Sequence, residues 1–280
     1  MAADDSWQPE QWPQLSAFAD EVRHQLVFGN GFVRIRGLAD LALDVDQMQR
    51  AYARIGTAIG APLLNYGLLY PVTDRGADHT KAAIPVSMTG AETCFHTDSS
   101  ALRVVPDFVG LLCEQPSEHG GDSLVSNAIL ACQRLQKESP ELLAELLVPL
   151  VRDIVTPGLE KTRANLLRNR FPVIAPCSRP GGVLVRYMRY WIEAGHKRAG
   201  VPIDASQRQA FDRFDSLLKH KDHVVRFRLE RGDMVWINNR RVAHNRTAFE
   251  DTPGNVRSLQ RMWLEMRAED AAGCHDRNTP

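Results

Sequence analysis

The chain has 280 residues, 44% of them hydrophobic, and its 34 basic residues balance its 34 acidic ones. This length can bury the core of one large domain, and the balanced charge excludes an overall field that would attract nucleic acid or an anionic membrane. The sequence shows neither a secretory signal nor a long apolar segment. We therefore expect one cytoplasmic domain, residues 1–280, that acts on a small molecule and binds neither nucleic acid nor membrane.

The five cysteines argue against two further classes of protein. They are odd in number, widely spaced and free of CxxC pairs. A disulfide framework needs paired cysteines and a structural zinc site needs closely spaced ones, so neither is expected. The sequence leaves the oligomeric state open, and a homo-oligomer is compatible with it.

The N-terminal third predicts a helix, a strand, a second helix and a long loop. Residues 1–14 are acidic and interrupted by prolines, and we expect them to be loose. Helical spacing of apolar positions over 15–26 precedes an alternating, strand-like run at 32–36. A second helix is predicted at 46–59. The stretch 63–90 is irregular and rich in Gly, Pro and Thr, which indicates a lid loop beside an active site.

The remainder of the chain predicts many short strands with helices between them. Residues 127–150 are expected to form a helical insertion, 205–218 an amphipathic helix, and 268–280 a loose C-terminus. The predicted strands are Cys94–Asp98, Phe108–Cys113, Ser123–Ser126, Gly182–Tyr187, His223–Leu229, Met234–Asn238 and Ser258–Met266. Because no regular alternation of strand and helix occurs, these strands favour an antiparallel barrel or double sheet flanked by helices.

A candidate metal site begins with His96 and Asp98. On a strand, side chains two residues apart leave from the same face and can converge on one ion. The composition predicts roughly one His-x-Asp/Glu pair by chance, so the pair alone is weak evidence. His220 and Asp222 have the same spacing within a charged run, and we interpret them as part of a solvated turn.

His244 supplies a third candidate ligand. It follows a Gly-Asp turn at 232–233 and an apolar strand that ends in polar residues. A set of two histidines and one carboxylate leaves three positions of an octahedral iron ion open, which is the arrangement that oxygen activation by iron(II) requires. The sequence therefore predicts that His96, Asp98 and His244 form such a set.

Two arginines after His244 suggest a binding site for an acid. If 257–264 is a strand, Arg257 and Arg261 project from one face. A buried guanidinium is costly without an anion, and its planar fork matches a carboxylate. A dicarboxylate would satisfy both arginines, although an arginine pair that faces solvent remains the alternative.

The chain resembles the TauD/TfdA-type dioxygenases, which include taurine dioxygenase and 2,4-dichlorophenoxyacetate dioxygenase. The resemblance rests on four ordered blocks: FHTDSS at 95–100, GGDS at 120–123, the Gly-Asp to His-Asn-Arg region at 232–251, and RSLQRMWL at 257–264. It implies a mainly β fold with helical insertions, whose core is a double-stranded β-helix (a jelly roll, cupin-like) flanked by helices. It also implies Fe(II) as cofactor and 2-oxoglutarate and O2 as co-substrates.

Carried over residue by residue, the resemblance implies a role for six positions. Iron would be bound by His96, Asp98 and His244. The distal carboxylate of 2-oxoglutarate would be bound by Arg257 and by Ser123, which stands where the family usually has Thr. Arg261 matches a second arginine that lies near the C1 carboxylate. Because Asp98 is present where related halogenases carry Gly or Ala, halogenation is not expected.

The substrate is the least determined part of the prediction. Six candidate substrate-binding residues lie in the expected lid, after the metal motif or in the LVRYMRYW segment: Asn65, Tyr66, Tyr70, Arg103, Tyr187 and Arg189. Arginines with tyrosines suggest a small polar, acidic or amino-acid-derived metabolite. Hydroxylation is the expected reaction, with desaturation or epoxidation as alternatives.

The alternative from another class is a cupin-like metal hydrolase or metal-binding protein. It would use the same three ligands, but it would give Ser123, Arg257 and Arg261 no role.

Overall fold

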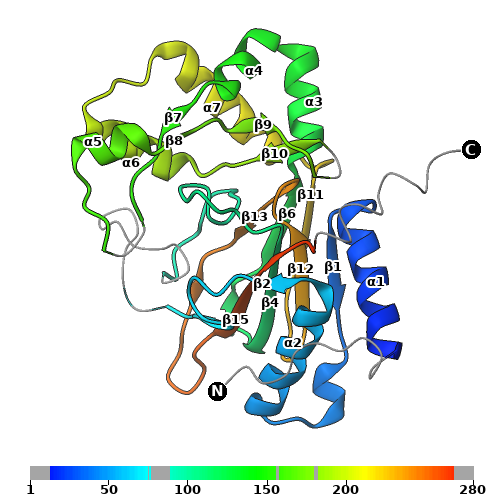
Figure 1. Ribbon diagram of the computed structural model, residues 1–280. Helices are drawn as coiled ribbons and strands as arrows, with labels where there is room; N and C mark the ends of the chain where they lie inside the picture. The colour runs from blue at the N-terminus through cyan, green and yellow to red at the C-terminus, as the bar shows by residue number, and fades with distance from the viewer. Residues whose placement is uncertain (1–12, 75, 77–88, 156–157, 180–181, 268–280) are drawn as a thin grey trace, which may run out of the picture.

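The computed structural model of the chain describes residues 13–74, 76, 89–155, 158–179 and 182–267 (Figure 1). Nearly all of the expected loose termini and part of the expected lid loop fall on 1–12, 75, 77–88 and 268–280, which lie outside the described residues. Residues 13 and 14 already belong to the first helix, α1 (Pro13–Val27).

A large antiparallel sheet forms one half of the core. Its strands follow the order β1-β12-β4-β15-β2, and β3 also pairs with β15. Their bounds are β1 Phe32–Ile35, β2 Ala61–Pro62, β3 Tyr70–Val72, β4 Phe108–Gln115, β12 Met234–Asn238 and β15 Ser258–Glu265. Helices α1 and α2 (Val45–Ile59) lie beside this sheet (Figure 1) and share an apolar core with it, which includes Tyr52, Trp236 and Met262.

A smaller sheet faces the large one. It has the order β11-β6-β13, with bounds Val224–Phe227, Ser123–Asn127 and Val242–Arg246. Apolar side chains from both sheets, among them Val125, Val235 and Leu259, pack between them. Every strand pair in the two sheets is antiparallel. Two facing antiparallel sheets flanked by helices form the jelly-roll architecture that the sequence predicted.

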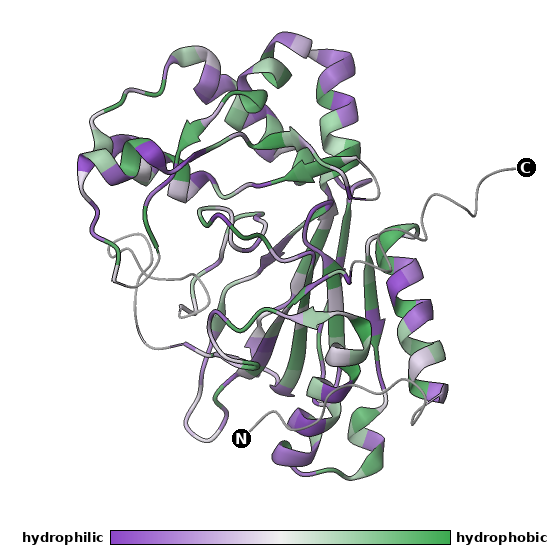
Figure 2. Cartoon of the chain, viewed as in Figure 1, coloured by the Kyte–Doolittle hydropathy of each residue, from purple (hydrophilic) through white to green (hydrophobic). Residues whose placement is uncertain are grey.

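A helical layer covers one end of the sheets (Figure 1). It contains α3 (Ala128–Glu138), α4 (Pro140–Leu147), α5 (Arg163–Arg168), α6 (Arg189–Ala199) and α7 (Ala205–Leu218), together with the strand pairs β7–β8 (Leu150–Val151, Arg170–Phe171) and β9–β10 (Ile174–Pro176, Val183–Val185). A third short pair, β5–β14, joins His119–Gly120 to Phe249–Glu250. Hydrophobic and hydrophilic residues alternate around α1 and α3, as expected of amphipathic helices (Figure 2).

Helix α7 begins and ends where the sequence predicted. Its N-terminus carries a reciprocal capping box, in which Asp204 accepts a hydrogen bond from the Gln207 N–H and the Gln207 side chain accepts one from the Asp204 N–H. Such a box satisfies backbone donors that the first turn would otherwise leave without partners.

Among the described residues, no helix is long and apolar enough to cross a lipid bilayer.

The strand predicted over Cys94–Asp98 is wrong. Within this segment only His96 pairs with another strand, through an isolated bridge to His244, and a turn begins at Asp98. Helices α5 and α6 were not predicted either. Since the expected same-face geometry of a strand does not apply, another feature must bring His96 and Asp98 together.

Candidate active site

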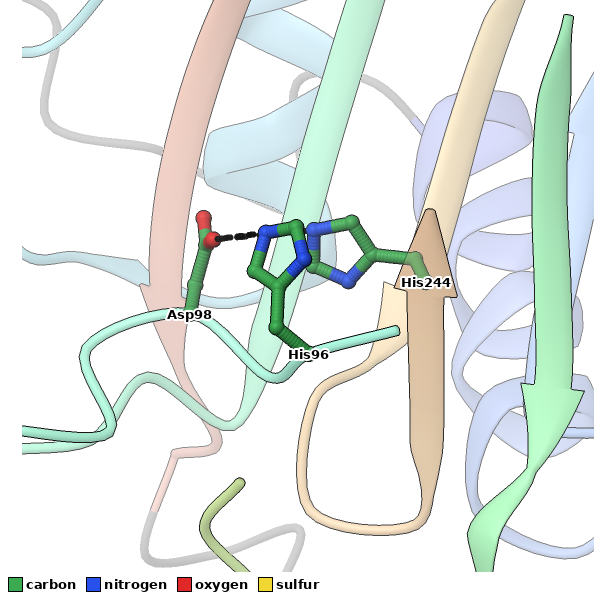
Figure 3. Close-up of side chains that lie close together, drawn as sticks. All are labelled: His96, Asp98 and His244. Carbon is green, nitrogen blue, oxygen red and sulfur yellow. Dashed lines mark ion pairs between the residues drawn. The ribbon is translucent and has the colours of Figure 1, made fainter. Parts of the chain in front are cut away.

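Three side chains from two distant parts of the chain point toward one another (Figure 3). Nε2 of His96 lies 3.7 Å and Nε2 of His244 lies 3.5 Å from Oδ1 of Asp98. Each residue offers one potential ligand atom, and these three atoms lie within 4.8 Å of one another. The backbones hold this arrangement, because the His96 N–H donates to the His244 carbonyl at 2.9 Å and the His244 N–H to the His96 carbonyl at 2.8 Å.

A turn, rather than a strand, directs Asp98 toward the histidines. The Asp98 N–H donates to Oδ1 of Asn239 at 2.7 Å, and Nδ2 of Asn239 donates to the Asp98 carbonyl at 3.1 Å. Asn239 is fully buried and follows β12. Ser99 continues the turn with a φ of +62°, a left-handed conformation that is uncommon for a residue with a side chain. The turn is thus fastened to the large sheet on both sides of Asp98.

The protonation states of two of these residues suit a metal ligand. Burial, with a further contribution from His244, lowers the pKa of His96 to about 4, so its imidazole is neutral near pH 7. Nδ1 of His96 lies 2.8 Å from the Cys94 carbonyl, which favours a proton on Nδ1 and leaves the Nε2 lone pair available. Burial alone would raise the pKa of Asp98, but Arg261 and the two histidines hold it well below its usual range.

A first cavity extends from these residues between the two sheets. Its walls include Leu111, Val235 and Leu259 from the large sheet and Ser123 and Val125 from the small one. The empty volume is about 670 Å³, including the part open to solvent. Such a space, with apolar walls and a few polar groups, is typical of small-molecule sites.

Arg257 is a buried cation in the wall of this cavity. The residue is 5% exposed, and its guanidinium forms no ion pair with any acid among the described residues. It lies 4.8 Å from the centroid of the Phe249 ring, and burial lowers its pKa to about 10. A charged guanidinium that is removed from water without an acidic partner favours an anionic ligand.

Arg261 lies closer to Asp98. Its Nη1 donates to Oδ2 of Asp98 at 3.1 Å, and its guanidinium lies 4.9 Å from the ring centroid of Tyr70 and 4.6 Å from that of Trp263. Arg257 and Arg261 both line the first cavity, as the alternation of a strand predicts, although the register of β15 shifts between Ser258 and Leu259.

A second cavity lies on another side of Asp98. Its wall is largely aromatic and apolar, with side chains from 66–70, from the loop 97–102, from α6 and from β15. The residues that line both cavities are His96, Asp98 and Arg261. His96 and Asp98 therefore lie between two chambers of different character, and His244 lines the first of them.

Two of the predicted substrate-binding residues, Tyr66 and Tyr70, line the second cavity. Their rings meet edge to face at a centroid distance of 5.6 Å. Asn65 and Arg103 are exposed and line neither cavity. The structure thus brings Tyr66 and Tyr70 together and leaves Asn65 and Arg103 outside.

The structure also places Tyr187 and Arg189 away from both cavities. Tyr187 is fully buried in the core beneath α7, and its hydroxyl donates to Asp215 at 2.7 Å. Arg189 forms ion pairs with Glu193, Asp212 and Asp215 at 2.6 to 3.0 Å. Because these acids satisfy the guanidinium, Arg189 connects α6 to α7 and has no donor directed at a substrate.

Sequence reasoning missed four residues that shape the site. Trp263 lines the second cavity two positions after Arg261, so extending the strand alternation by one step would have found it. Asn239 belongs to the Asn-Asn pair before His244, and no sequence pattern indicates that its side chain would contact Asp98. Met188 and Trp191 line the second cavity from the start of α6, a helix that the sequence did not predict.

A jelly roll in which two histidines and one carboxylate converge is typical of non-haem iron oxygenases. Comparison with known families agrees with this class, since residues 2–263 match the family described as taurine catabolism dioxygenase TauD, TfdA family. The chain therefore belongs to the TauD/TfdA family of dioxygenases and shares its dependence on Fe(II) and 2-oxoglutarate.

Individual relatives are distant. FR-33289 synthase of Streptomyces rubellomurinus (strain ATCC 31215) is 24% identical over 254 residues, which cover 86% of this chain and 71% of the synthase. The gamma-butyrobetaine dioxygenase of Homo sapiens is 25% identical over 223 residues, 79% of this chain and 53% of that protein, so the chain spans about half its length. A structure of the non-haem iron oxygenase OrfP with Fe and alpha-ketoglutaric acid has a TM-score of 0.65 at 17% identity, and the match covers 96% and 87% of the two chains.

Proposed function

We propose that His96, Asp98 and His244 bind Fe(II), and that Arg257 and Ser123 bind the distal carboxylate of 2-oxoglutarate in the first cavity. The primary substrate occupies the second cavity, where an unactivated C–H bond is oxidised, most simply to an alcohol. Succinate and carbon dioxide leave from the first cavity. The substrate is a small polar metabolite, acidic or derived from an amino acid.

The observation that carries the proposal is the position of Arg257. It is a buried guanidinium without an acidic partner among the described residues, and it lines the same cavity as the three candidate ligands. A dicarboxylate such as 2-oxoglutarate could neutralise Arg257 with one end and reach the metal with the other. Ser123 begins β6 and lines this cavity, and in this proposal its hydroxyl adds a second donor.

The bound iron supplies the oxygen chemistry, and the chain supplies orientation and exclusion of water. The neutral Nε2 of His96 and the ionised Asp98 provide ligand atoms at neutral pH without the loss of a proton. Arg261 lies between the two cavities, so it is placed to meet the C1 carboxylate of the co-substrate. Aliphatic side chains such as Leu111 and Val235 line the first cavity and restrict water there.

The substrate class is supported by the chemistry of a structural neighbour and by the second cavity. OrfP has been solved with succinate and (3S)-hydroxy-L-Arg, a hydroxylated amino acid. In this chain the second cavity offers aromatic surface from Tyr66 and Trp263 next to Asp98. Arg103 and Arg189 lie outside it, so among the described residues Arg261 is the arginine placed to recognise an acidic group of the substrate.

The test is an anaerobic titration of the metal-free protein with Fe(II) and 2-oxoglutarate. Chelation of the keto acid to iron should give a weak visible metal-to-ligand charge-transfer band, and Arg257→Ala should lose that band at limiting 2-oxoglutarate. Iron binding without a band would contradict the co-substrate assignment. A positive result would be followed by a substrate screen that measures succinate release, with amino acids and their derivatives as the first set.

A further inference from the structure

The two oxygens of Asp98 have different surroundings. Oδ1 faces Nε2 of both histidines at 3.5 and 3.7 Å. Oδ2 accepts a hydrogen bond from Nε1 of Trp263 at 2.7 Å and another from Nη1 of Arg261 at 3.1 Å. One oxygen is therefore directed toward the candidate metal position, while the other is held by two donors on β15.

We infer that Trp263 is a positioning residue that restricts Asp98 to one metal-binding oxygen. This inference rests on the proposed function. A carboxylate can bind a metal through one oxygen or through both. If Oδ2 also bound the iron, it would occupy one of the three positions left open by a set of two histidines and one carboxylate. The bidentate co-substrate and oxygen together need all three of these positions.

Trp263 is better suited to this task than Arg261, although both contact Oδ2. The guanidinium of Arg261 lines both cavities, so an incoming anionic co-substrate competes with Asp98 for it. The indole N–H is neutral and is not drawn away by such an anion. When Arg261 turns toward the co-substrate, the hydrogen bond from Trp263 remains on Oδ2.

The indole ring is also fixed in position. Tyr66 meets it edge to face at a centroid distance of 5.2 Å, and Arg261 covers it at 4.6 Å. An indole has two side-chain torsions, so little freedom remains once the ring is packed on two sides. Trp263 also lines the second cavity, which places the substrate against the ring whose N–H holds the metal ligand.

The test is Trp263→Phe, which removes the N–H and retains an aromatic ring. Groups that orient a metal ligand typically contribute about 10- to 100-fold to metal affinity. We expect Trp263→Phe to weaken Co(II) and Fe(II) binding by that factor, measured by chelator competition without co-substrate. With 2-oxoglutarate added, so that the co-substrate competes for Arg261, the visible spectrum of the Co(II) variant should shift toward a higher coordination number as Oδ2 becomes a ligand. Trp263→His, which restores a ring N–H, should recover part of the affinity.

Trp236→Phe is the matched control. The Nε1 of Trp236 is buried in the core without a hydrogen-bond partner among the described residues, so its removal breaks no hydrogen bond. The smaller Phe ring should lower stability by leaving a cavity and should leave metal affinity unchanged. Unchanged metal affinity and an unchanged Co(II) spectrum in Trp263→Phe would overturn the role of Trp263. A wild-type protein that bound neither metal would overturn the proposed function together with the inference. If both Trp263 and Trp236 variants lost affinity equally, the effect would be one of core packing and the inference would fail.

Discussion

The two cavities that meet at Asp98 differ in how they are built. The first lies between sheets, and three of its polar residues, Ser123, Arg257 and Arg261, come from strands or from positions next to them. The second is walled by the loops around Tyr66 and Ser100 and by the start of α6. Strand positions follow an alternation that a sequence displays, whereas loop positions depend on tertiary contacts. The sequence could therefore indicate strand residues that line the first cavity, whereas it indicated few of the loop and helix residues that line the second.

Removing a candidate iron ligand should abolish the function of both cavities and give the largest effect. Asp98→Ala and His244→Ala should reduce succinate release to background, because each removes one of three candidate iron ligands. The fold should persist, since the jelly-roll core does not depend on these side chains. Circular dichroism and thermal melting would verify folding. His220→Ala is the matched control for a histidine outside the site, and a similar loss of activity there would contradict the assignment.

Removing Arg257 should affect the first cavity alone. A hydrogen bond to a charged group contributes about 1.5–3 kcal/mol, so Arg257→Ala should raise the concentration of 2-oxoglutarate needed for half-maximal rate by about 10- to 150-fold. The KM for the primary substrate should change little. Arg226→Ala removes an exposed arginine that pairs with Asp122 and serves as the control. Equal increases in both KM values would show that the cavities are not separate.

Tyr66→Ala should affect the second cavity. It removes ring surface from that wall and the edge contact with Trp263. We expect the KM for the primary substrate to rise by about tenfold, since an aromatic contact contributes about 0.5–1.5 kcal/mol beyond its buried area. The charge-transfer band of the complex with Fe(II) and 2-oxoglutarate should persist. A variant that lost this band would place Tyr66 on the co-substrate side instead.

Arg189→Ala should give the smallest effect on catalysis. The guanidinium is tied to three acids of α6 and α7, and partly exposed ion pairs contribute about 0–1 kcal/mol each. We expect a lower melting temperature with unchanged KM values for both substrates. Steady-state kinetics with each substrate varied in turn would check this. A selective rise in the KM for the primary substrate would return Arg189 to the substrate site.

Much of the fold could be predicted because local patterns determine it. Helix α7 follows from its apolar spacing and capping box, and strands β12 and β15 follow from apolar or alternating runs. Helix α6 escaped prediction because its buried face includes Gly195 and His196, which weaken both the apolar pattern and the helix propensity. Tyr187 and Arg189 were predicted to bind substrate because the sequence does not reveal their acidic partner. That partner, Asp215, lies on α7 and contacts both residues only in the folded protein.

The convergence of the three candidate metal ligands was anticipated for a reason that was only partly right. The spacing of His96 and Asp98 suggested one face of a strand, but the segment is a turn fastened by Asn239. The residue types were sufficient to identify the family. The orientation of Asp98, however, depends on the buried side-chain amide of Asn239, which lies far away in the sequence. Sequence spacing alone cannot reveal such a partner.

The reciprocal backbone bridge between His96 and His244 has a consequence for folding. These residues are far apart in the chain, and each donates its N–H to the carbonyl of the other. Contacts of such long sequence separation form slowly, because the loop between them must close first. The three ligands should therefore come together only when the two sheets have docked. The rate at which refolding protein acquires metal affinity would then report the completion of the fold itself.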